Sequence, residues 1–255
     1  MKKYAQLILV GITLTGIFQF THELGHLVVT IAYGGRATWG FSSPIQMWDQ
    51  APRDESVWEP ISLPTGDTGW VKFENPDTKS GEILFNSLGP IFSLAAFMIF
   101  LLSYVRSQSE QHQKLLLIGI FLLTFTLGFY YLTANTKVWS DEKAMAYLLD
   151  TTDLLFIIPL ALIYFAGLAF SSVQLYKLGF RAKHFLIFIV TNIGTGVLMN
   201  RTQQIIIQQV DNGNALFNPI LGFSAPVFLF FAFCFGLFAY LWRRWDIGVQ
   251  KIMLA

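Results

Sequence analysis

Six apolar stretches constrain the fold of this chain more than any other feature of its sequence. They cover residues 4–33, 83–105, 115–134, 154–176, 184–199 and 221–242. A helix needs about 20 apolar residues to cross a hydrocarbon core about 30 Å thick, and only the fifth stretch is clearly shorter. We therefore predict an all-α polytopic membrane protein with about six transmembrane helices, built as a single membrane domain over residues 1–255.

Composition supports the same class and excludes others. Hydrophobic residues make up 54% of the chain and charged residues only 13%, whereas a soluble domain carries about 25% charged residues. The net charge of +1 excludes a nucleic-acid binder with a basic face, so we expect the lipid bilayer as a partner and no nucleic acid. The single cysteine, Cys234, excludes an intrachain disulfide and a cysteine-ligated metal cluster.

Lysine and arginine predict the orientation, because they concentrate in short cytoplasmic loops. With the N-terminus inside, the inner side holds ten of the seventeen, namely Lys2, Lys3, Arg106, Lys114, Lys177, Arg181, Lys183, Arg243, Arg244 and Lys251. Both termini are therefore predicted to be cytoplasmic, and we expect a bacterial cytoplasmic membrane rather than a eukaryotic organelle. The seven tryptophans, Trp39 among them, lie in loops or at the ends of the stretches, where an interfacial belt is expected.

The segment 34–82 is the one long connection and is predicted to be an extramembrane loop. It contains five of the nine prolines, a density that forbids a long helix. Residues 37–42 and 69–73 are candidates for short β-strands. The segment is either a solvated loop or a small β-ribbon that lies over a site and guides a substrate.

One motif in the first stretch, Thr21-His22-Glu23-Leu24-Gly25-His26, indicates metal binding and catalysis. On a helix, His22 and His26 project from one face, and two imidazoles at this spacing can bind one Zn²⁺. Zinc activates a water and polarises a scissile carbonyl, while Glu23 can take the proton of the water and return it to the leaving amine. Ionisable residues in a membrane span indicate function; the alternative is a polar patch satisfied by hydrogen bonds between helices.

The motif, followed by Ala32-Tyr33-Gly34-Gly35-Arg36, resembles the site-2 protease family of intramembrane zinc metallopeptidases. The segment Asn86-Ser87-Leu88-Gly89-Pro90-Ile91-Phe92-Ser93 is similar to the Gly-Pro-x-x-Asn segment of that family, with Ser93 at the Asn position. The resemblance covers roughly residues 18–150. It implies a three-helix metalloprotease-like core that residues 83–150 complete, membrane-anchored proteins as substrates, and residues 154–242 as additional transmembrane helices. It also implies that an aspartate from the third core helix completes the zinc site.

Two polar residues of the second stretch are predicted to bind substrate. Asn86 and Ser93 lie seven residues apart and so share one helical face, from which they could hold a substrate backbone. The alternative is that they form hydrogen bonds between helices.

The third zinc ligand is predicted to be Asp141. Two histidines leave a catalytic zinc one protein ligand short, and a carboxylate commonly supplies it. In the predicted orientation, Asp141, Glu142, Asp150 and Asp153 all lie on the side at which the first stretch ends. Asp141 is preferred because Ser140-Asp141 can open a helix over 141–150 that turns it toward the histidines, and because it falls where the aspartate of the family would. Asp150 and Asp153 are the alternatives, or Asp141 only caps that helix; the usual Leu-Asp-Gly of the family is absent.

The sequence therefore predicts an intramembrane zinc endopeptidase that cleaves membrane-anchored proteins. A divalent-metal transporter with His22 and His26 at a midspan site is an alternative, although the later stretches lack histidines or carboxylates for a pathway. An inactive protease-like membrane binding protein is another, although metal binding alone would not require Glu23.

Overall fold

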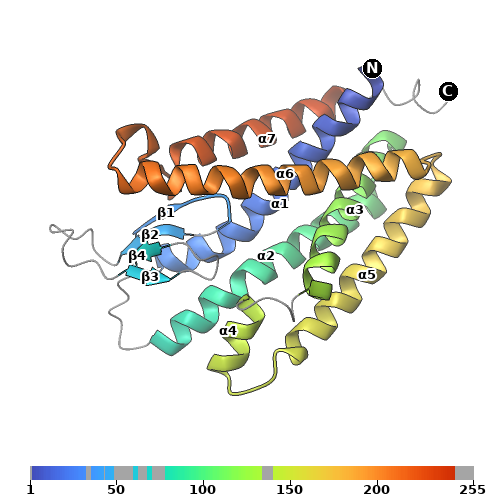
Figure 1. The fold of residues 1–255 in the computed structure, drawn as a ribbon. Helices are drawn as coiled ribbons and strands as arrows, with labels where there is room; N and C mark the ends of the chain where they lie inside the picture. Colours follow the sequence, from blue (N-terminus) through green and yellow to red (C-terminus); the bar gives the residue numbers. More distant parts are fainter. Residues whose placement is uncertain are drawn as a thin grey trace.

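Long helices dominate the computed structural model, which describes residues 2–32, 36–42, 44–48, 60–62, 68–70, 78–133 and 140–244. Within these ranges six helices are long and apolar enough to cross a membrane (Figure 1). They are α1 (Lys2–Ala32), α2 (Thr78–Arg106), α3 (Glu110–Thr133), α5 (Leu154–Lys177), α6 (Ala182–Asp211) and α7 (Ala225–Arg244). A short helix, α4 (Asp141–Leu148), lies between α3 and α5 in the chain. The predicted class, an all-α polytopic membrane protein, is confirmed.

Helices α2 and α3 each begin five residues before the predicted stretches, and the last two membrane helices also differ in extent from the prediction. Helix α6 has 30 residues and runs well past position 199, because residues 200–211 are compatible with a helix and none of them is glycine or proline. Its length of about 45 Å exceeds a hydrocarbon core of about 30 Å. Helix α7 begins at Ala225 rather than 221, because residues 219–224 form a hairpin of two short strands.

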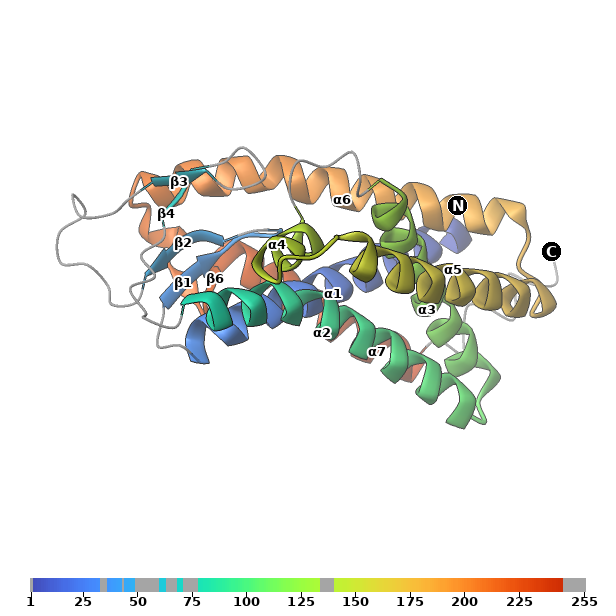
Figure 2. The same ribbon diagram turned by 90° about the horizontal axis from the view of Figure 1, so that it is seen from below.

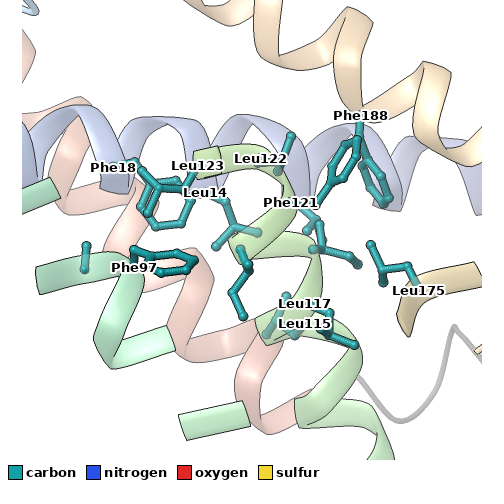
Figure 3. Packing of buried hydrophobic residues seen from close by; sticks show 14 of the residues in the cluster. Leu14, Phe18, Phe97, Leu115, Leu117, Phe121, Leu122, Leu123, Leu175 and Phe188 are labelled. Carbon is teal, nitrogen blue, oxygen red and sulfur yellow. The ribbon is translucent and has the colours of Figure 1, made fainter. Parts of the chain in front are cut away.

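Helix α1 occupies the centre of the bundle and packs against α2, α6 and α7 (Figures 1 and 2). A cluster of buried side chains joins α1, α2, α3 and α6, among them Leu14, Phe18, Phe97, Phe121 and Phe188 (Figure 3). Lipid is as apolar as these side chains, so the hydrophobic effect does not drive membrane helices together. Close van der Waals packing stabilises their contacts instead. This packing places α1 firmly against α2, the second helix that contributes to the site.

The threonines of α1 are satisfied within the helix itself. The hydroxyls of Thr13, Thr15 and Thr21 each donate to the carbonyl four residues earlier at 2.8 Å. Such bonds allow a hydroxyl to lie in lipid without a partner on another helix. The histidines of α1 bond instead to residues of α2, whereas Glu23 has one local donor, Gln19, and one from outside the helix.

A mixed six-stranded sheet lies beside the C-terminal end of α1 (Figures 1 and 2). Its spatial order is β3-β4-β2-β1-β6-β5. Its strands are β1 (Arg36–Trp39), β2 (Pro44–Trp48), β3 (Pro60–Ser62), β4 (Thr68–Trp70), β5 (Pro219–Ile220) and β6 (Phe223–Ser224). The strands predicted over 37–42 and 69–73 correspond to β1 and β4, although residues 71–73 lie outside the described ranges. Strands β5 and β6 come from the connection before α7 and were not predicted.

Strand β1 lies inside the sheet and returns along α1. It pairs antiparallel with β2 and parallel with β6, and the Trp39 backbone N–H donates to the Gly222 carbonyl at 2.8 Å. The Trp39 side chain is 0% exposed and contacts Glu23, which lies nine residues, or about 14 Å, before the end of α1. The strand therefore carries Trp39 back to the level of the motif, and its predicted place in an interfacial belt stays a prediction.

Candidate metal centre

Helix α1 presents the two histidines of the motif side by side. His22 and His26 are one helical turn apart, and their Nε2 atoms lie 3.3 Å from each other. His26 is 5% exposed and Glu23 3% exposed. The helix alone thus brings two imidazole nitrogens to one point, as the four-residue spacing predicts.

Helix α4 brings Asp141 to the same point. The Ser140 side chain caps this helix by accepting from the Lys143 backbone N–H, so Asp141 becomes its first residue. The Asp141 Oδ2 atom lies 3.4 Å from the Nε2 of His22 and 3.5 Å from the Nε2 of His26. Burial would raise the pKa of the Asp141 carboxyl, but hydrogen bonds and charge from both histidines hold it well below its usual range.

The alternative ligands lie elsewhere. Within the described ranges, the single group of three or more such residues that could hold a metal ion is His22, His26 and Asp141. Asp150 is exposed and follows α4 in the left-handed backbone region, with a φ of 52°. Asp153 stands at the N-cap position of α5, although its side chain makes no capping hydrogen bond. The structure therefore places Asp141, and not these two, beside the histidines.

The three donor atoms fit a tetrahedral metal ion. Their separations of 3.3, 3.4 and 3.5 Å form a nearly equilateral triangle. Tetrahedral zinc with ligands at about 2.0–2.1 Å requires about 3.3–3.4 Å between ligand atoms. The triangle thus matches one face of a zinc tetrahedron, and no further His, Cys, Asp or Glu of the described residues joins the group.

Hydrogen bonds on the far side of each ring show which nitrogens face the centre. The His26 Nδ1 lies 2.8 Å from the Phe85 carbonyl oxygen, which only accepts, so Nδ1 carries a proton. The Nε2 atom is on the opposite side of the ring and faces the Asp141 carboxylate. A ligating histidine typically donates its other N–H to a carbonyl, so Nε2 is the nitrogen of His26 that would bind a metal ion.

Ser93 lies behind the other histidine. Its Oγ is 3.0 Å from the Nδ1 of His22, and the residue is 3% exposed. Ser93 is thus positioned to orient His22, while its predicted role in substrate binding stays a prediction. Asn86 is partly buried on α2, and its predicted role likewise stays untested.

Two glycines allow α1 and α2 to approach closely at the centre. A Cβ at Gly25 would collide with the backbone of Leu88 and Gly89, and a Cβ at Gly89 would collide with the ring of His26. Gly25 therefore permits a close contact between the two helices. Gly89 gives the Gly-Pro segment a specific task, which is to leave room for the imidazole of His26.

We expect Gly89→Ala to weaken zinc binding by at least about tenfold, because the added methyl group displaces His26 from its bond to the Phe85 carbonyl. Competition with a chromophoric chelator measures the affinity. Gly236→Ala is the matched control, since a Cβ there meets nothing within 4 Å. Equal zinc affinity in the two variants would contradict the assignment.

Glu23 is held by two donors on its two oxygens. Gln19 donates to Oε1 at 2.8 Å, and the indole N–H of Trp39 donates to Oε2 at 2.6 Å. The indole also stacks on the ring of His26, with 8° between the planes. Each carboxylate oxygen keeps a free lone pair, so Glu23 can still accept a proton from water.

Sequence reasoning missed Trp39, Gln19 and the Phe85 carbonyl. The position of Gln19, four residues before Glu23 on the same helix face, was a usable signal. The other two had none, because they reach the site through the return of β1 and through a backbone atom of α2.

The centre is more open on one side than on the other. The side chains of His22 and Asp141 are 26% and 23% exposed, whereas that of His26 is 7% exposed. Glu23 and Trp39 close the side next to the sheet. The centre is therefore most accessible from the His22–Asp141 edge.

Comparison of the chain with protein-family models, with curated proteins and with solved structures found no match.

Proposed function

We propose that this protein is an intramembrane zinc endopeptidase that cleaves membrane-anchored proteins. The observation that carries the proposal is the convergence of His22, His26 and Asp141, with Glu23 next in sequence to the first ligand. A metal site that served only structure would have four protein ligands, whereas three protein ligands and an open position are typical of catalytic zinc. A glutamate beside such a site also matches the need for a general base.

Each residue has a defined task in this proposal. Zinc would lower the pKa of a water and polarise the scissile carbonyl. Glu23 would accept the proton of the attacking water and then give it to the leaving amine. Gln19 and Trp39 would hold the Glu23 carboxylate in place by their hydrogen bonds to its two oxygens.

The substrate must reach the centre in an extended form, because the peptide bonds of a helix are covered and hydrogen-bonded. Strand addition to the sheet is one route. Strand β1 has partners on both sides, so the outer strands β3 and β5 are where a substrate strand could add. The segment 34–82 would thus guide a substrate through its outer strand β3, and not through β1, which contacts Glu23.

Peptide cleavage in detergent tests the function directly. The purified protein is incubated with single-span membrane substrates that differ in helix stability, with zinc present or after chelation. We expect cleavage that depends on zinc and favours the less stable helices. Metal uptake into vesicles without cleavage would instead support a divalent-metal transporter, and zinc binding with neither activity would support an inactive membrane binding protein.

We expect the centre to lie toward the outer face of a bacterial cytoplasmic membrane, with both termini in the cytoplasm. His22 is 18 residues after Tyr4, or about 27 Å along the helix, within a core of about 30 Å. Tags at residue 1 and within 34–82, exposed to protease from outside intact cells, measure the orientation. Digestion of the N-terminal tag with protection of the loop tag would reverse the assignment.

A further inference from the structure

A buried carboxylate that the proposed chemistry does not use lies directly after Asp141. Glu142 is 1% exposed. Successive residues of a helix point about 100° apart, so Asp141 faces the histidines while Glu142 faces the interior of the bundle. The Tyr131 hydroxyl donates to its Oε1 at 2.7 Å and the Tyr130 hydroxyl to its Oε2 at 3.5 Å.

The surroundings of Glu142 are built for a carboxylate. Burial of such a group is unfavourable unless hydrogen bonds compensate, and both tyrosines come from the end of α3. Tyr131 also stacks on Tyr164 of α5, with centroids 5.8 Å apart and 5° between the rings. Two phenols of α3 thus donate to this side chain, and a third, on α5, packs against the ring of Tyr131.

The short helix needs such an anchor to hold its orientation. Helix α4 has eight residues, and isolated helices shorter than about 12 residues are marginal by themselves. Its Ala144, Met145 and Ala146 are buried, and it packs against α2 and α5. Apolar contacts alone tolerate sliding and rotation, whereas a hydrogen-bonded carboxylate one residue after Asp141 specifies the rotation of the helix at that point.

We propose that Glu142 and Tyr131 are positioning residues that aim Asp141 at the metal ion and so determine the affinity of the centre. This inference rests on the metal centre of the proposed function. The hydrogen bond to Tyr131 fixes Glu142, Glu142 fixes the first turn of α4, and the first turn holds Asp141 Oδ2 at 3.4–3.5 Å from both histidine nitrogens. Partners that orient a ligand typically contribute 10- to 100-fold to metal affinity.

The test measures metal binding by the full-length purified protein, with zinc affinity from chelator competition and coordination from the visible absorption of bound Co²⁺. We expect Glu142→Ala to weaken zinc binding about 10- to 100-fold and Tyr131→Phe about tenfold. Both should shift the Co²⁺ spectrum toward that of Asp141→Ala. Glu142→Gln should retain most of the affinity, because its amide oxygen still accepts from Tyr131. Tyr147→Phe, at an 80% exposed position of α4, is the control.

A double variant separates positioning from general damage to the fold. In the Asp141→Ala background, Glu142→Ala should cause no further loss of zinc affinity, because the ligand through which it acts is already absent. Tyr131→Phe keeps the ring and its stacking, so it stays informative if Glu142→Ala does not fold. Wild-type affinity and spectrum in Tyr131→Phe, or an additive loss in the double variant, would overturn the inference.

Failure of the inference is distinguishable from failure of the proposed function. If the wild-type protein binds no zinc through His22 and His26, the metal centre itself is wrong. If it binds zinc and loses it in Glu142→Ala but not in Asp141→Ala, Glu142 is the ligand and the positioning role is overturned.

Discussion

Glu23→Gln is expected to abolish proteolysis while zinc stays bound. Glutamine nearly matches the shape of glutamate, and its amide oxygen can still accept from the indole N–H of Trp39. It cannot accept the proton of the attacking water, and general-base catalysis contributes typically 10²- to 10⁴-fold. Cleavage should therefore fall by at least about 100-fold, while zinc content and affinity stay near those of the wild type because Glu23 does not belong to the donor triangle.

Single-turnover cleavage together with zinc content per chain measures this effect. Glu110→Gln is the matched control, because it makes the same change at the start of α3, more than 20 residues and about 30 Å along that helix from Tyr131. Normal cleavage by Glu23→Gln would exclude the mechanism as written. Loss of zinc in this variant would instead show that Glu23 supports the metal centre structurally.

Loss of the metal is the second large effect, expected for His22→Ala and His26→Ala. Each substitution leaves two donors of the triangle, and zinc in proteins requires at least three for a stable catalytic site. His26→Ala also leaves the Phe85 carbonyl without its partner and opens a space beside Gly89. Neither variant should retain stoichiometric zinc after dialysis, and neither should cleave substrate.

The same measurement decides the third ligand. Asp141→Ala is expected to weaken zinc binding strongly, whereas Asp150→Ala and Asp153→Ala should bind zinc like the wild type. These two are matched controls, since each removes a carboxylate from the same connection between α3 and α5. Full zinc content in Asp141→Ala with loss in either other variant would move the ligand to that residue.

Local sequence patterns were enough for the class of fold and for half of the candidate site. Apolar stretches of sufficient length specify membrane helices, because a single segment can satisfy its own backbone hydrogen bonds in lipid only as a helix. The spacing of His22 and His26 specifies one helical face, because 3.6 residues make a turn. Ser140 marks the start of α4 for a similarly local reason, which is that its side chain caps the first turn.

The partners of the motif were decided only by the tertiary structure. Trp39 is an ordinary loop tryptophan in the sequence and reaches Glu23 only because β1 turns back along α1. The Phe85 carbonyl has no sequence signature at all, since every residue has one. Ser93 lies 71 positions from His22, and only the close approach of two helices at Gly25 and Gly89 joins them.

The choice between two neighbouring acids shows most clearly what the sequence determines and what depends on the tertiary structure. Asp141 and Glu142 are adjacent carboxylates at the start of one short helix, and either could serve as a zinc ligand by its chemistry. The sequence by itself determined that a helix begins there and that acids occupy its first turn. Which acid faces His22 and His26 depends on how α4 is rotated against the bundle. That rotation follows from contacts between segments that are distant in the sequence. The tyrosines of α3 donate hydrogen bonds to Glu142, and Asp141 then faces the histidines.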